Sequence, residues 1–231
     1  MNVVGFMYEV IRTAVEVISA VMCFILLRFM IKPYENTGES RYLGLPLGFG
    51  FLGATYLFSA LVFFAESQTP PIDFLIQIYH VQFIARTYAF LFIAVTYYFS
   101  KKPTEKSRLV WKTTLILSIV LLITSLLIVS IPNVTVYSYI ITRNVFRVLN
   151  LIIILYICIH TFRSHIEKPD PETILIPLAY IILLVSQYSV LLFQLDMSIY
   201  AFFAALALRL VFLSILLLVS FKAFWSTKKE G

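Results

Sequence analysis

Seven long apolar segments constrain the fold of this chain more than any other feature of its sequence. Each contains about 20 residues or more, which as a helix is long enough to cross a hydrocarbon layer ~30 Å thick. None shows the alternation of polar and apolar residues that is typical of strands, so each is predicted to be a helix. The segments lie at residues 5–31, 43–65, 73–99, 111–131, 136–162, 174–194 and 198–224. We therefore predict an all-α integral membrane protein in which residues 1–231 form a single domain of seven transmembrane helices.

The charged residues predict how this domain is oriented. Only 13% of the residues are charged and 61% are hydrophobic, whereas soluble domains have about 25% charged residues. Five of the 18 lysines and arginines lie inside the spans. The other 13 flank alternate connections or the C-terminus, while the remaining connections carry Glu66, Asp73 and Asp196. By the positive-inside rule, we expect a multi-pass protein of the cell membrane, embedded in the lipid bilayer, with an extracellular N-terminus and an internal C-terminus. Because the net charge of +6 reflects this topology, no nucleic-acid partner is expected.

The first three and the last three spans show a similar pattern. Three residues of the first span recur 135 residues later in the fifth, where Arg12, Cys23 and Arg28 reappear as Arg147, Cys158 and Arg163. This spacing predicts a 3+1+3 arrangement, with parallel repeats at residues 5–99 and 136–224 and a linker helix at 111–131. The alternative is chance similarity between segments rich in isoleucine and leucine.

Five arginines lie inside the predicted spans: Arg12, Arg86, Arg143, Arg147 and Arg209. A guanidinium group stays protonated in proteins, so each of them needs a buried carboxylate, a ligand, a water-filled cavity or a partner subunit. Charged residues within membrane spans are rare and commonly mark functional sites. The arginines are therefore the first candidates for a functional site.

Other polar residues lie at a similar depth in the spans. Glu9, Arg12 and Glu16 share one face of the first span, because they are spaced at i, i+3 and i+7. His80 enters the third span from the outer side, and Gln187 lies in the outer half of the sixth. We therefore predict one polar cavity near the outer side. The candidate ligand-binding residues are Glu9, Arg12, Glu16, His80, Arg86, Arg143, Arg147, Gln187 and Arg209.

The charges of these residues favour an anion as the ligand. Five arginines face only Glu9 and Glu16, which leaves an excess of three positive charges if His80 is neutral. Guanidinium groups are well suited to carboxylates and phosphates, because their N–H groups form a planar fork. Two alternatives remain: the arginines form interhelical ion pairs completed by water and backbone carbonyls, or they face a partner subunit or lipid phosphates.

The sequence gives no indication of an enzyme or a metal site. His160 and His165 lie near the inner surface, and no further histidine or cysteine stands at a spacing that suits a metal ion. Hydrolase and phosphate-cradling motifs are also lacking. We therefore expect a protein without enzymatic activity and without a bound metal.

Short motifs in three spans are shared with one seven-helix family. They are Ala85-Arg86 followed by Phe90-Leu91-Phe92 in the third span, Leu184-x-Ser186-x-Tyr188-x-Val190 in the sixth and Arg209-x-x-Phe212 in the seventh. In these motifs, the number of helices and the expected orientation, the chain resembles the microbial rhodopsins. The resemblance implies a rhodopsin-like helical scaffold.

The chain departs from that family at the position on which its chemistry depends. Arg209 stands where the resemblance would place the lysine that binds retinal, and Ala89 and Ala205 stand where it would place the counterion aspartates. Lys222 lies only at the inner end of the seventh span. We therefore expect no covalently bound retinal, no other cofactor and no light-driven pumping.

Together these features favour a receptor or sensor that binds a small anionic or polar ligand in an arginine-lined cavity. Only six residues follow Trp225, so the signal is expected to pass to a separate membrane or cytoplasmic partner protein. Two other functions are consistent with the sequence. The chain could be a small-molecule transporter with 3+1+3 repeats, or a non-catalytic subunit of a larger membrane complex.

Overall fold

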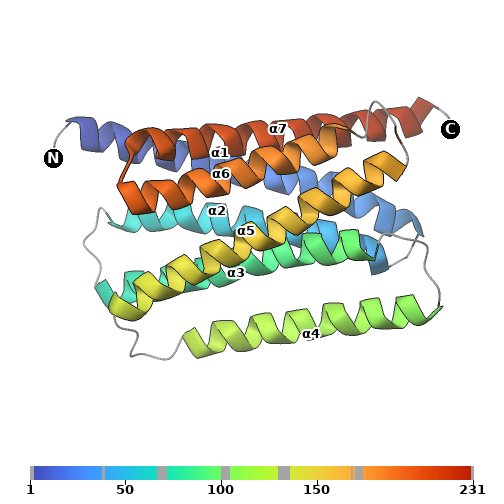
Figure 1. Ribbon diagram of the computed structural model, residues 1–231, viewed down its shortest axis with the longest axis horizontal. Coiled ribbons are helices and arrows are strands. Elements are labelled where there is room, and N and C mark those ends of the chain that lie inside the picture. Colours follow the sequence, from blue (N-terminus) through green and yellow to red (C-terminus); the bar gives the residue numbers. More distant parts are fainter. Residues whose placement is uncertain are drawn as a thin grey trace.

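The structure is a computed structural model that describes residues 3–37, 40–66, 72–99, 105–129, 136–167, 169 and 174–229. These residues form seven α-helices and one short 3-10 helix, and contain no strand (Figure 1). The elements are α1 (Val3–Thr37), η1 (Ser40–Leu43), α2 (Gly44–Glu66), α3 (Ile72–Tyr98), α4 (Glu105–Val129), α5 (Val136–Glu167), α6 (Leu175–Asp196) and α7 (Ile199–Lys229). The prediction of an all-α protein is confirmed for the part of the chain described.

Six of the seven helices are long and apolar enough to cross a membrane. They are α1, α2, α3, α5, α6 and α7, whose apolar stretches contain 20 to 29 residues each. The apolar stretch described for α4, Val110–Ser125, is shorter. The length and composition of the helices therefore support a multi-pass membrane protein.

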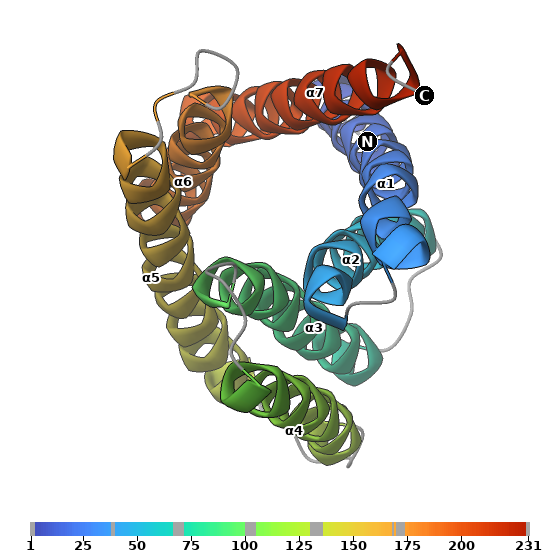
Figure 2. The ribbon, with the colours of Figure 1, turned by 90° about the vertical axis from the view of Figure 1, so that its right-hand side faces the viewer.

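These six helices form a ring, and α4 lies outside it (Figure 2). Consecutive helices pack against each other in the groups α1–α2–α3 and α5–α6–α7. The two groups meet where α1 contacts α7 and where α3 contacts α5, while α4 packs mainly against α3. A site inside the ring can therefore touch both three-helix groups at once.

Glycines allow α2 to lie very close to α3. A side-chain carbon built on Gly48 would lie 2.9 Å from the carbonyl oxygen of Ala89 and 2.5 Å from Cγ1 of Ile93. By contrast, Gly50 faces α1, where the nearest atom is the end of the Leu27 side chain at 2.7 Å. Close approach of helix backbones at small residues is typical of membrane helices, because packing rather than water exclusion drives their association.

The inside of the ring is packed mainly with aromatic and aliphatic side chains. Phe49, Phe90, Leu183 and Phe212 are at most 1% exposed, and belong to one continuous core that includes residues of α1, α2, α3, α5, α6 and α7. The outward faces of the ring also carry apolar residues, such as Ile152 on α5, which is 59% exposed. An apolar exterior of this kind suits contact with lipid.

Candidate functional site

Four arginines from four different helices line one cavity inside the ring. The cavity has a volume of about 100 Å³. Its polar wall consists of Arg12 and Glu16 of α1, Arg86 of α3, Arg147 of α5, Ser186 and Gln187 of α6, and Arg209 of α7. Apolar side chains of α6 and α7, among them Phe193 and Phe202, complete it. The structure thus brings together six of the nine residues that the sequence predicted as a site.

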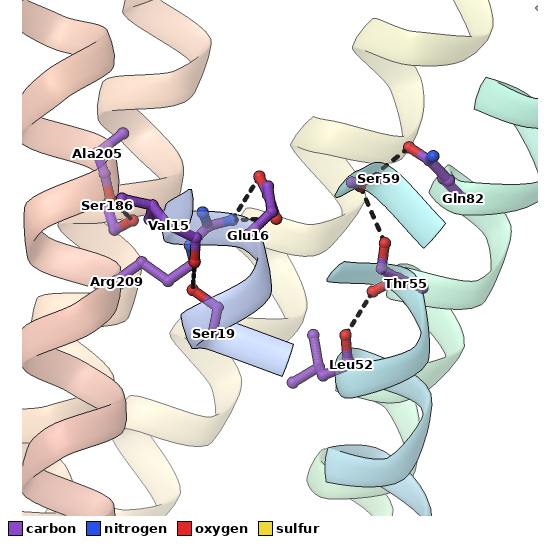
Figure 3. A network of polar contacts seen from close by, with 10 residues as sticks. All are labelled: Val15, Glu16, Ser19, Leu52, Thr55, Ser59, Gln82, Ser186, Ala205 and Arg209. Carbon is purple, nitrogen blue, oxygen red and sulfur yellow. Dashed lines mark hydrogen bonds and ion pairs between the residues drawn. The ribbon is translucent and has the colours of Figure 1, made fainter. Parts of the chain in front are cut away.

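Arg209 forms a buried ion pair with Glu16, which joins α7 to α1 (Figure 3). Nη1 of Arg209 donates to both carboxylate oxygens of Glu16, at 3.0 and 3.1 Å. The two side chains are only 7% and 8% exposed. Because one nitrogen makes both contacts, the rest of this guanidinium group is left for other partners. Glu16 therefore compensates the charge of one arginine.

Aromatic rings hold the guanidinium groups of Arg12, Arg86 and Arg209. The ring of Tyr56 lies beside two of them: its centre is 4.5 Å from the central guanidinium carbon of Arg209 and 5.2 Å from that of Arg86. The central guanidinium carbon of Arg12 lies 3.4 Å from the centre of the Phe63 ring. The face of an aromatic ring attracts a cation but carries no net charge. These contacts position the guanidinium groups but neutralise none of their positive charge.

The remaining arginine of the cavity is held by the backbone of α6. Nη1 of Arg147 donates to the carbonyl oxygen of Val190 at 3.3 Å. This hydrogen bond joins α5 to α6, and, like the aromatic contacts, it leaves the charge uncompensated. Ser186 acts between α6 and α7, where its hydroxyl group donates to the carbonyl oxygen of Ala205 at 2.7 Å (Figure 3).

The cavity wall therefore has an excess of positive charge and of hydrogen-bond donors. Among the described side chains that line it, four arginines face one carboxylate, which gives them a formal charge of +3. Nε of Arg86, Nε of Arg147, and Nε and Nη2 of Arg209 are buried and have no hydrogen-bond partner among the residues that the structure describes. Unsatisfied buried donors are destabilising, by about 1–3 kcal/mol each and more when charged. An anion in the cavity would relieve both imbalances.

Three of the predicted site residues are not among those that line the cavity. His80 is buried between α3 and α5, where Nδ1 lies 2.7 Å from the carbonyl oxygen of Ile76 and the ring packs against Tyr139. The guanidinium carbon of Arg143 lies 5.5 Å from the centre of the Tyr139 ring. The side chain of Glu9 lies outside the described residues.

Tyr56 is one of the residues that the sequence-based prediction missed. It is only 1% exposed and lies under two of the cavity arginines. Its position in a glycine-rich apolar span did not distinguish it from an ordinary packing residue, because the sequence does not show which face of that span is turned to the arginines.

A packed apolar layer separates the cavity from a pair of tyrosines on the far side. The hydroxyl group of Tyr97 on α3 donates to that of Tyr180 on α6 at 3.3 Å. Phe90 lies between Arg86 and Tyr97 along α3, and Phe212 of α7 packs against Tyr180 with ring centres 5.6 Å apart. Both phenylalanines are at most 1% exposed. In this direction the cavity ends against the core.

No family model, no curated protein and no solved structure matches this chain. The resemblance to the microbial rhodopsins therefore remains a prediction. No group of three or more histidine, cysteine, aspartate or glutamate side chains that could hold a metal ion occurs among the residues described. The chemistry that the site can support follows from the arginines: they can bind and orient an anion.

Proposed function

We propose that this protein is a membrane receptor or sensor for a small anion, which binds in the cavity between the two three-helix groups. One observation carries the proposal: four arginines and a single glutamate line the same cavity. Intramembrane charges are rare and commonly belong to binding sites or ion pathways. Among the described residues of the wall, Glu16 can offset only one of the four guanidinium charges, so an anion is the complementary ligand.

The size of the cavity limits the ligand to a few heavy atoms. A volume of about 100 Å³ has room for several water molecules, since about 10–15 Å³ of accessible volume is enough to hold one. Pockets for drug-sized organic molecules are several times larger, at about 300–1,000 Å³. This comparison favours an inorganic anion or a very small carboxylate over a metabolite that carries a ring or a long chain.

The proposed topology is seven spans with an extracellular N-terminus. Although the apolar stretch described for α4 is short, the whole helix contains 25 residues and is about 37 Å long, which exceeds the ~30 Å of a hydrocarbon layer. The basic residues at alternate connections support the orientation. The cavity would then lie nearer the extracellular side, because the arginines occur early in α1, α5 and α7.

The arrangement of the arginines suggests how binding could become a signal. Arg12 and Arg86 belong to the group α1–α2–α3, whereas Arg147 and Arg209 belong to α5–α6–α7. An anion held by both groups would favour the helix packing in which the four arginines lie closest together. A ligand shifts such an equilibrium only through its different affinities for the two packings. A separate membrane or cytoplasmic protein would read the change.

Binding and transport can be separated in one set of experiments. The purified protein should unfold at a higher temperature in the presence of its anion, by about 2.7 kcal/mol of stabilisation at a concentration of 100 Kd. Proteoliposomes loaded with the same anion should show no flux above that of empty liposomes. Stabilisation without flux supports a receptor. No stabilisation and no binding by any small anion would contradict the proposal.

Transport is the second candidate function, and the position of the cavity favours it. The cavity lies between two groups of three helices that carry arginines at related positions, with Arg12 corresponding to Arg147 and Arg86 to Arg209. Transporters with repeats commonly bind their substrates between the repeats near the middle of the membrane. Saturable anion flux that is lost in Arg209→Gln would identify this protein as a transporter instead.

A further inference from the structure

We infer that the ligand is a free tetrahedral oxyanion with two negative charges, of the phosphate or sulfate class. This inference rests on the proposed function, because it concerns the same cavity, and it names the ligand class that the cavity would select. Three properties of the cavity support it: the positions of the unpartnered donors, the charge of the wall and the volume.

The unpartnered donors belong to cavity-lining arginines of three helices, α3, α5 and α7. Glu16 occupies Nη1 of Arg209, so the edge of this guanidinium group that carries Nε and Nη2 has no partner among the described residues. This edge is the fork that binds two oxygens of one anion side by side. Nε of Arg86 on α3 and Nε of Arg147 on α5 are the other unpartnered donors of the wall.

Four donors of this kind match four oxygens better than two. A carboxylate has two oxygens in one plane, and the Arg209 fork alone would occupy both. A tetrahedral oxyanion has four oxygens that point in different directions. Two of them can accept the fork, and the other two can accept from α3 and α5. Such an anion would satisfy the donors of all three helices at once.

The charge of the wall favours two negative charges over one. The four arginines and Glu16 sum to +3, so a monovalent anion would leave +2 and a divalent anion +1. Uncompensated charge is more unfavourable in a buried site than in water, because the surrounding protein screens it weakly. A divalent anion therefore gains more from entering this cavity.

The volume favours a free anion over a phosphate group that belongs to a lipid. A cavity of about 100 Å³ has room for a tetrahedral oxyanion of five heavy atoms, but not for the glycerol and acyl chains of a lipid as well. A lipid headgroup and a free anion share the same phosphate chemistry. A soluble headgroup analogue can distinguish them.

The inference can be tested by competition for radiolabelled sulfate on the purified wild-type protein in nanodiscs. Unlabelled sulfate, phosphate, nitrate, acetate, chloride and glycerol phosphate would be compared at equal ionic strength. We expect sulfate and phosphate to compete at least tenfold better than the monovalent anions and glycerol phosphate. Direct competition is preferable to thermal unfolding, because sulfate and phosphate stabilise proteins in general by exclusion from their surfaces.

A matched pair of arginine variants tests whether binding occurs in the cavity. Arg86→Lys keeps the charge but removes the Nε donor, and should weaken sulfate binding by about tenfold to a hundredfold, as expected for the loss of one charge-assisted hydrogen bond. Arg28→Lys alters an exposed arginine outside the cavity, which pairs with Glu35 at 3.4 Å, and should leave binding unchanged. Equal affinities of both variants would place the anion elsewhere and overturn the inference.

The other outcomes separate this inference from the proposed function. Stronger binding of labelled acetate or chloride than of sulfate would overturn the divalent class, while a small-anion receptor would remain supported. Stronger competition by glycerol phosphate than by phosphate would indicate a lipid headgroup and overturn the free anion. If no labelled anion binds the wild-type protein at millimolar concentration, both the inference and the proposed function fail.

Discussion

Replacing Glu16 by glutamine should destabilise this protein strongly, because it leaves a buried arginine without its counter-charge. In the wild type, Nη1 of Arg209 contacts both carboxylate oxygens of Glu16, and both side chains are less than one-tenth exposed. Glutamine has nearly the same shape and keeps one oxygen as an acceptor. The change therefore removes one negative charge from the cavity wall, whose formal charge rises from +3 to +4, and alters little else.

The expected magnitude follows from the burial of the pair. Removing one partner of a buried ion pair is destabilising by about 3–5 kcal/mol, because the other charge remains buried. Since glutamine still accepts one hydrogen bond, we expect the lower end of this range. For a chain of this length, ~3 kcal/mol corresponds to a decrease in Tm of about 6–12 °C. The measurement is thermal unfolding of the purified variant in a buffer without oxyanions.

Two further variants make this prediction specific to the buried pair. Glu35→Gln removes the acid of an exposed pair with Arg28, whose side chains are 48% and 69% exposed respectively, and should change stability by less than ~1 kcal/mol. The double variant Glu16→Gln with Arg209→Met removes both buried charges and should recover most of the lost stability, since a buried pair can often be replaced by neutral residues. Wild-type stability of Glu16→Gln alone would refute the buried pair.

Three other predictions concern helix packing and can be measured by thermal or denaturant unfolding. Gly48→Ala should destabilise the α2–α3 contact by about 1–3 kcal/mol through overpacking. Gly50→Ala should be neutral or slightly stabilising, because only the end of a flexible side chain must move. Equal effects of the two substitutions would contradict the close contact between α2 and α3. Ser186→Ala should lower stability by about 0.5–1.5 kcal/mol through loss of its hydrogen bond to α7, and no change would argue against that bond. Tyr97→Phe and Tyr180→Phe should show a coupling below ~1 kcal/mol in a double-mutant cycle, since their hydroxyl groups are 3.3 Å apart; a larger coupling would mean a shorter bond.

The spans predicted from apolarity match some helices more closely than others. The predicted segments 43–65 and 174–194 differ by at most two residues at either end from α2 and α6. For the segment 5–31, however, α1 continues to Thr37. Apolarity stops where a helix leaves the hydrocarbon layer, but the backbone hydrogen bonds of a helix can continue through polar residues. Hydropathy alone therefore underestimates helices that extend beyond the membrane.

Depth along the helices explains which predicted site residues reach the cavity. Arg143 and Arg147 share one face of α5, but they differ by one turn, or about 6 Å along the axis. Arg147 lines the cavity, whereas Arg143 lies beside Tyr139. His80 precedes Arg86 by six residues, about 9 Å along α3. Residues of one helix can thus lie at different depths relative to the cavity, whose depth depends on how the helices pack.

The partners of the arginines could be predicted only in part. Glu16 was a candidate because it is one of two acids in the first span, but its pairing with Arg209 requires contact between α1 and α7, the first and last helices of the ring. The aromatic partners Tyr56 and Phe63 were not predicted, because the second span, which contains both, has many aromatic residues and the sequence does not indicate which of them face inward.

Anomalous diffraction from crystals grown with selenate would test most directly whether the four-arginine cavity binds an anion. Selenate has the shape and charge of sulfate, and its selenium atom can be located without ambiguity. We predict a selenium peak in the cavity, with selenate oxygens about 2.7–3.2 Å from the guanidinium nitrogens of Arg86, Arg147 and Arg209. Selenate bound only at the protein surface, with Arg86 and Arg147 instead paired to carboxylates, would contradict it.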